Sequence, residues 1–241
     1  MEQKSLAKKK GIADIVFLLD VSGSMQPCID GLKNNISTFI DYLTTPTANN
    51  QTVLKEWRIK IAGYSDYKAD GDQWWQEFPF SNDANQVKDD LQALQLRGGG
   101  DEPESLLDGL WKLTKLPEKG RGAPVDPNAW RHRADATRVV VVFTDATYHP
   151  QISLPEAGGA RFEDLNREVA AARLILSVFC PEADCYHELA AIDMSDIKFV
   201  GDLENAVEKM KGFTADIENF KNTLEQLAKT VTRTSQAGDV L

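Results

Sequence analysis

An aspartate and two serines, Asp20, Ser22 and Ser24, stand at alternate positions directly after the apolar run Ile15–Leu19. The run is too short to cross a membrane and is typical of a strand buried on both faces. Helix-forming sequence follows, so the three side chains are expected on one tight turn between a strand and a helix. In an open parallel sheet, ligands bind in the crevice beyond such strand ends. One carboxylate and two neutral hydroxyls there suit a small hard cation such as Mg²⁺.

A second apolar run, Val139–Phe143, also ends in an aspartate, Asp145. If the two predicted strands are neighbours, Asp20 and Asp145 converge at the same edge of the sheet. Aspartates that converge in this way repel each other unless a cation or an arginine lies between them. The two strand ends together therefore strengthen the prediction of a metal site.

The stretch Asp20-x-Ser22-x-Ser24 resembles the metal-ion-dependent adhesion site of the von Willebrand factor type A family and matches that motif in full. Thr144-Asp145-Ala146 is similar to the family's Thr-Asp-Gly loop, with alanine in place of the usual glycine. The resemblance covers roughly Asp14 to Val200. It implies that the aspartates and serines of these two loops are metal ligands.

The family's second loop differs here, because Gly-Gly-Gly-Asp-Glu-Pro-Glu places Glu104 where many members have a threonine. A similar Asp-x-Pro-Glu occurs in the integrin β-subunit version, in which the glutamate joins the metal shell. The resemblance therefore implies Glu104 as a fifth ligand. The string, together with Trp57-Arg58 and the stretch 63–66, also resembles bacterial members found with alpha-type protein kinases. No kinase catalytic segment is visible, so the chain would be the binding domain alone.

Two further acids, Asp66 and Asp101, could hold a second cation beside Glu104, as in the integrin β version, although acidic loop residues are usually solvated. Simpler roles are open for the main site as well. Ser22 or Ser24 could merely cap a helix. Pro103 suits the first turn of the next helix, and Glu104 could serve that helix only by facing the positive end of its dipole.

The composition limits the class of partner. The 241 residues carry a formal charge of −10, which argues against nucleic acid or an anionic membrane, since both require a basic face. The sequence contains no run of 18 or more apolar residues, so no segment is expected to span a membrane. The polar N-terminal stretch lacks the apolar core of a signal peptide, so export is not indicated. The three cysteines, Cys28, Cys180 and Cys185, are interpreted as reduced thiols, so a cytoplasmic location is expected.

Strands and helices alternate along the chain, which predicts an α/β fold with a doubly wound, mainly parallel sheet and helices on both faces. Residues 74–80 are expected to form a short antiparallel edge strand, and residues 117–137 a long surface loop that could serve recognition. We expect a flexible lead-in at 1–12, the domain at 13–212 and a tail at 236–241. The spacing of apolar residues over 213–235 predicts one long helix, which would pack on the domain or on a partner. Its apolar positions are Phe213, Ile217, Phe220, Leu224, Leu227 and Val231.

The leading function is a non-catalytic module that binds an acidic side chain of another protein through Mg²⁺, or through Mn²⁺ or Ca²⁺. A kinase, phosphatase or ATPase of the same system is a candidate partner. The alternative is a Mg²⁺-dependent phosphatase-like hydrolase of the haloacid dehalogenase type. Such enzymes need Asp-x-Asp after the first strand, whereas this chain has Ser22 there and no acid to protonate a leaving group. A structural protein that assembles through its last helix is the third possibility.

Overall fold

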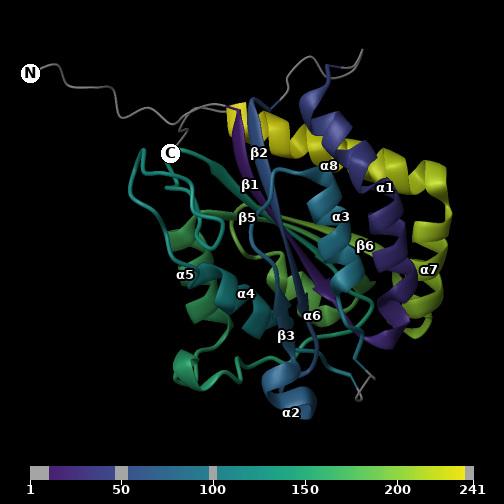
Figure 1. Ribbon diagram of the computed structural model, residues 1–241. Coiled ribbons are helices and arrows are strands. Elements are labelled where there is room, and N and C mark those ends of the chain that lie inside the picture. The colour runs from purple at the N-terminus through teal and green to yellow at the C-terminus, as the bar shows by residue number, and fades with distance from the viewer. Residues whose placement is uncertain (1–10, 47–53, 98–101, 237–241) are drawn as a thin grey trace, which may run out of the picture.

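One sheet with the strand order β3-β2-β1-β4-β5-β6 forms the centre of the computed structural model, which describes residues 11–46, 54–97 and 102–236 (Figure 1). All neighbouring strands are parallel except β3, which is antiparallel to β2 at the edge. The strands are β1 Ile12–Asp20, β2 Glu56–Tyr64, β3 Trp75–Glu77, β4 Thr137–Phe143, β5 Leu174–Glu182 and β6 Ser195–Asp202.

Helices cover both faces of the sheet (Figure 1). The helices are α1 Gln26–Thr44, α2 Tyr67–Asp70, α3 Ala84–Ala93, α4 Leu106–Thr114, α5 Phe162–Ala172, α6 Asp184–Leu189, α7 Ala206–Ala215 and α8 Ile217–Gln236. Helices α1, α3, α7 and α8 pack over one face, and α4, α5 and α6 over the other. The predicted doubly wound sheet with an antiparallel edge strand is therefore confirmed. None of the helices in the described ranges is both long and apolar enough to cross a membrane.

The two central strands are buried along their whole lengths. Every residue of β1 and β4 is buried, because helices lie against both sides of the sheet. The two strands pair directly, with Leu19 opposite Phe143 at the last step of their register. The next residues along each chain, Asp20 and Thr144, therefore reach the C-terminal edge of the sheet side by side.

The predicted single C-terminal helix is two helices, α7 and α8, separated at Asp216. The Asp216 carboxylate accepts a hydrogen bond from the backbone N–H of Asn219 at 3.0 Å, so this residue caps a new helix instead of continuing the old one. Helix α8 packs along α1, and its Leu227 and Val231 are buried in the core. The side chains of Ile217, Phe220 and Leu224 lie outside the described part, as do residues 1–10 of the predicted lead-in and residues 237–241 of the predicted tail.

Residues 117–136 contain no helix or strand, but buried arginines attach them to the domain. Arg58 donates to the carbonyl oxygens of Asp126 and Ala129, at 2.7 and 2.6 Å. Arg138 donates to the carbonyl oxygen of Arg131 at 2.7 Å. The segment is thus held against the N-terminal ends of the strands, which the sequence pattern did not predict.

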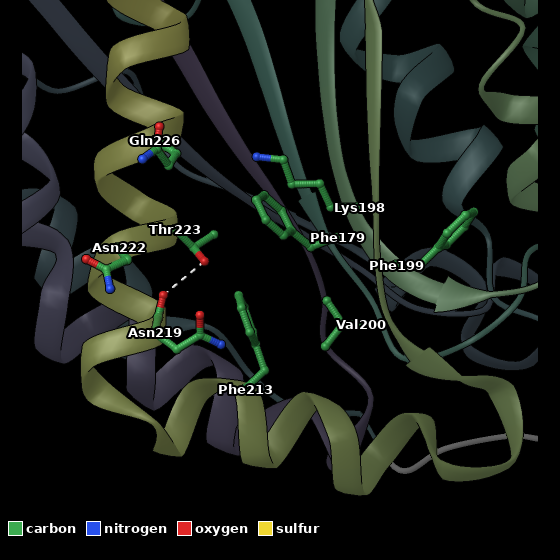
Figure 2. A pocket seen from close by; sticks show the side chains of 9 residues that line it. All are labelled: Phe179, Lys198, Phe199, Val200, Phe213, Asn219, Asn222, Thr223 and Gln226. Atoms are coloured by element: carbon green, nitrogen blue, oxygen red, sulfur yellow. Dashed lines mark hydrogen bonds between the residues drawn. The ribbon is translucent and has the colours of Figure 1, made fainter.

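A pocket of about 380 Å³ lies between α8 and the edge strand β6 (Figure 2). Phe179 and Phe213 stack with their ring centroids 6.1 Å apart within it, and Lys198 lies over Phe179. None of the residues that line this pocket is a predicted metal ligand, so the pocket and the candidate site are separate features.

Arg58, which holds residues 117–136 against the domain, forms a buried ion pair at the start of β1. Asp14 is fully buried, and Arg58 donates to its two carboxylate oxygens at 2.7 and 2.6 Å. The Arg131 backbone N–H donates to the same carboxylate at 2.9 Å. Removing one partner of a buried pair leaves an uncompensated charge in the interior.

We predict that Asp14→Ala lowers the free energy of unfolding by about 3–5 kcal/mol, because Arg58 is then buried without a carboxylate. The matched control is Glu168→Ala, which breaks an ion pair with Lys115 whose side chains are 38% and 45% exposed. That change is expected to cost less than about 1 kcal/mol. Urea unfolding measures both, and equal small losses would contradict the assigned role of Asp14.

Candidate metal site

The Asp20 carboxylate is fully buried and accepts hydrogen bonds from Ser22 and Thr144. The backbone N–H of Ser22 donates to Oδ1 at 2.8 Å, and the Thr144 hydroxyl donates to Oδ2 at 2.9 Å. Asp20 is the last residue of β1, and Thr144 follows the last residue of β4. The two bonds fix the carboxylate at the C-terminal edge of the sheet, between the two central strands.

The two serines lie together beside this carboxylate. Their hydroxyl oxygens are 3.0 Å apart, and Ser24 also hydrogen-bonds Asp145. A 3-10 turn at Gly23–Met25 connects β1 to α1, and Ser22 makes no side-chain capping bond to that turn. The residue that caps α1 is Met25. Ser22 therefore occupies the N-cap position of the 3-10 turn without a capping bond from its side chain, and both hydroxyls remain near the strand ends.

The third carboxylate, that of Glu104, is brought to the site by backbone pairing. The Glu104 N–H donates to the carbonyl oxygen of Thr147 at 2.9 Å, and its own carbonyl accepts from the N–H of His149 at 3.0 Å. These bonds attach the residue to the loop after β4. Helix α4 begins only at Leu106, so the predicted helix start at Pro103 is wrong and Glu104 lies outside the first helical turn.

Burial and mutual repulsion favour the protonated forms of these acids. Burial raises the pKa of Asp20 to about 6, and the charge of Asp145 adds to the rise. The pKa of Glu104 is raised to about 8 by burial first and then by Asp20, Asp66, Asp70 and Asp145. Burial also raises the pKa of Asp145, although the hydrogen bond from Ser24 opposes it. The structure thus gathers acidic groups that no basic side chain of the described ranges neutralises.

Two carboxylate oxygen atoms at the strand ends have no hydrogen-bond donor in the described ranges and could bind a cation. Glu104 Oε2 and Asp145 Oδ2 are buried and make no hydrogen bond to any residue in the described ranges. Asp20, Glu104 and Asp145 likewise form no ion pair with a basic side chain of those ranges. Buried carboxylate oxygens without a donor are costly, and a hard divalent ion would satisfy them.

The donor set is mixed in kind. In the part of the chain that is described, no three or more His, Cys, Asp or Glu side chains form a cluster that could hold a metal by themselves. Any ion would therefore depend on the serine hydroxyls and on water as well as on the acids. Mg²⁺ keeps several waters in most protein sites, so a partial set of protein ligands suits it.

Only one member of the predicted second cation site can be placed, because Asp101 lies outside the described residues. The other member, Asp66, caps α2 by accepting from the Lys68 N–H at 3.0 Å. Its Oδ1 also lies 3.0 Å from Nε2 of His149. Asp66 is thus already engaged with its own turn and with a histidine, and the second cation site stays a prediction.

Two residues at the site were not identified from the sequence, namely Thr144 as a donor to Asp20 and His149 as a contact of Asp66. Their positions in the sequence indicated only that both residues lie close to Asp145. Thr144 immediately precedes Asp145, and His149 stands four residues after it in the same loop. Which side chain each of them meets depends on pairing between loops, and spacing along the chain does not reveal that.

Solved structures with a similar fold include proximal thread matrix protein 1 from the mussel byssus. Its crystal form 2 is 16% identical, with a TM-score of 0.51, and covers 88% of this chain and 49% of that chain. A second structure, described as having a zinc occupied MIDAS motif, is 15% identical with a TM-score of 0.50 and the same coverage. This chain spans about half the length of those proteins, and at such identity the likeness shows the fold alone. A comparison with curated proteins found no match.

The von Willebrand factor type A domain model matches residues 14–230. The match covers the three loops described above and extends past residue 200, where the resemblance seen in the sequence ended, through α7 and into α8. The chain therefore belongs to the von Willebrand factor type A domain family.

Proposed function

We propose that this domain is a non-catalytic interaction module that binds an acidic side chain of another protein through a divalent cation. Domains of this family commonly mediate protein–protein interactions and bind a divalent metal at this kind of site. The observation that carries the proposal is the pair of buried, unbonded carboxylate oxygens on Glu104 and Asp145 at the strand ends. The residues that would hold the ion are Asp20, Ser22, Ser24, Glu104 and Asp145.

The charges of these ligands set how the site would behave. Three ionised carboxylates around a doubly charged ion leave a net charge of −1, whereas a threonine at position 104 would leave the site neutral. Glu104 therefore favours tight retention of the metal and weakens the attraction for an acidic ligand. The ion would supply the positive charge that a partner's carboxylate needs, and the chain's own residues would orient and retain it.

The proposal includes a class of partner, a metal and a location. Mg²⁺ is the expected ion, with Mn²⁺ or Ca²⁺ as alternatives, since all the donors are oxygen atoms. The partner would be a kinase, phosphatase or ATPase of the same system, as the resemblance to kinase-associated members suggests. The three cysteines are free thiols, two of them buried, which agrees with a cytoplasmic location.

The phosphatase alternative is disfavoured, because Ser22 occupies the position at which such an enzyme needs its second aspartate. We predict that the wild-type domain captures a protein from lysate in Mg²⁺. The captured protein is expected to be absent in EDTA and in the Ser22→Ala/Ser24→Ala variant, because both conditions remove the ion. Ser195→Ala, a serine change on β6, is the matched control that retains capture.

Two results would contradict this proposal. One is capture by the double variant at the wild-type level. The other is phosphate release from p-nitrophenyl phosphate that follows the protein through purification and is lost in Asp20→Asn.

Metal binding should stabilise the domain more strongly at high pH. The metal-free folded state holds protons on Asp20 and Glu104 up to pH of about 6 and about 8, whereas the unfolded chain releases them near pH 4. The stability that the protonated Asp20 and Glu104 contribute is therefore lost as the pH rises through this window. At the higher pH, binding of the metal also displaces fewer protons from these carboxyls. At a Mg²⁺ concentration near 100 times Kd, we predict a gain of about 2.7 kcal/mol at pH 8.5, seen as a rise of about 5–10 °C in Tm.

The same Mg²⁺ concentration should give a clearly smaller rise in Tm at pH 5.5. The Ser22→Ala/Ser24→Ala variant provides the baseline, since its Tm is expected to ignore Mg²⁺ at both pH values. A Mg²⁺-induced rise that is equal at the two pH values would show that these carboxylates do not hold the ion.

The variant Glu104→Thr tests the charge argument. We predict weaker binding of Mn²⁺ by about tenfold, because one anionic ligand is lost, and tighter binding of acetate to the metal-loaded protein, because the site becomes neutral. Calorimetry measures the first quantity, and relaxation of water protons near Mn²⁺ measures the second. Acetate affinity that is unchanged or lower with metal bound would count against the argument.

A further inference from the structure

We propose that Arg97 is a second anchor of this interaction site and that the partner segment carries two acidic groups, one for the metal and one for the Arg97 guanidinium. The inference rests on the proposed function and specifies the chemistry of the ligand. Arg97 lies in the same connection between α3 and α4 as Glu104 but precedes the Gly-Gly-Gly-Asp-Glu-Pro-Glu stretch, so its role has to be argued from its own contacts.

The backbone of Arg97 is fixed next to the serine loop. Its N–H donates to the carbonyl oxygen of Val21 at 2.8 Å, and Arg97 forms a parallel bridge with Ser22. Two residues earlier, Gln95 and Gln76 exchange hydrogen bonds of 2.8 and 2.7 Å. These contacts hold the short segment between α3 and the glycine run against both β1 and β3.

The guanidinium of Arg97 has no acidic partner in the part of the chain that the structure describes. Nη1 donates to Oε1 of Gln73 at 3.0 Å, and Nε is buried with no acceptor among the residues described. No carboxylate within those residues forms an ion pair with it. Within the described ranges, therefore, a neutral amide satisfies one donor and no carboxylate balances the positive charge.

Other arginines that are held in place in this domain behave differently. Arg58 and Arg131 both pair with Asp14, at 2.6 and 3.4 Å, and Arg138 pairs with Glu118 at 3.1 Å. An arginine fixed in position beside the site with only an amide partner is therefore available to an outside acid. Guanidinium groups bind carboxylates through parallel charge-assisted hydrogen bonds.

The layout favours a ligand with two acids over one with a single acid. The candidate metal ligands gather where β1 and β4 end, whereas Arg97 reaches Gln73 in the turn after β2, on the opposite side of β1. The metal and the guanidinium are thus two attachment points on either side of the serine loop.

The test uses small carboxylates on the Mn²⁺-loaded 241-residue chain. Binding is measured as the loss of water-proton relaxation when a carboxylate displaces metal-bound water. Succinate, glutarate and adipate are each compared with the matching half-amide, in which a neutral amide replaces the distal carboxylate. At least one diacid should bind about five- to tenfold more tightly than its half-amide, after the twofold statistical factor is removed. Arg97→Gln should bring that ratio to about one, with half-amide and Mn²⁺ affinities within about twofold of wild type, and Arg97→Lys should retain part of the ratio.

The control is Arg167→Gln, which changes the net charge equally at an exposed ion pair with Asp164 on α5 and should keep the wild-type ratio. If Mn²⁺ and the half-amides bind but every ratio is near one, or if Arg97→Gln keeps the wild-type ratio, the role of Arg97 is overturned and the metal site stands. Failure of wild-type protein to bind Mn²⁺ would instead overturn the proposed function, and this inference with it.

Discussion

Repulsion between buried carboxylates is the constraint on which this site depends. Asp20, Glu104 and Asp145 lie at the C-terminal edge of the sheet, largely removed from water and without a basic partner in the described part of the chain. A buried ion that is not paired costs several kcal/mol even after relaxation, so such groups take up protons or bind a cation. Protonation relieves the repulsion while the pH lies below the raised pKa values of these acids, and above those values a divalent ion would relieve it.

The fold brings these acids together through pairing in the centre of the sheet. Parallel pairing of β1 with β4 places the first and third loops next to each other, and the backbone bonds of Glu104 attach the second loop to the third. Close packing beneath the first loop depends on Gly63 of β2, where a Cβ atom would lie 2.6 Å from Val21 and 2.9 Å from Leu94. The sheet register therefore sets the positions of Asp20 and Thr144, whereas backbone bonds between two loops set the position of Glu104.

The sequence was most informative where a single physical cause dominates. Continuous apolar runs predicted the buried strands β1 and β4, and their ends located Asp20 and Asp145. It was least informative where two distant segments decide the outcome. The break between α7 and α8 depends on the capping bond of Asp216, which competes with an apolar stripe that continues past it. The hydrogen bond from the Thr144 hydroxyl to Asp20 depends on the register between β1 and β4. The attachment of residues 117–136 by Arg58 likewise joins positions about 70 apart in the chain, a distance over which local patterns carry no signal.

The two ends of β1 offer a comparison within one strand. Asp14 and Asp20 are both fully buried aspartates, separated by five apolar residues. At the first end, Arg58 on the neighbouring strand β2 and Arg131 in the segment before β4 both pair with Asp14. The negative charge of Asp14 is thus neutralised by residues of the chain itself. At the second end the neighbouring positions supply a threonine, two serines and two more acids. The fold neutralises Asp14 with arginines, whereas Asp20 has no basic partner among the described residues and lies at the end of the strand where parallel sheets bind their ligands. The difference is explained if the missing charge belongs to the function and not to the stability of the domain.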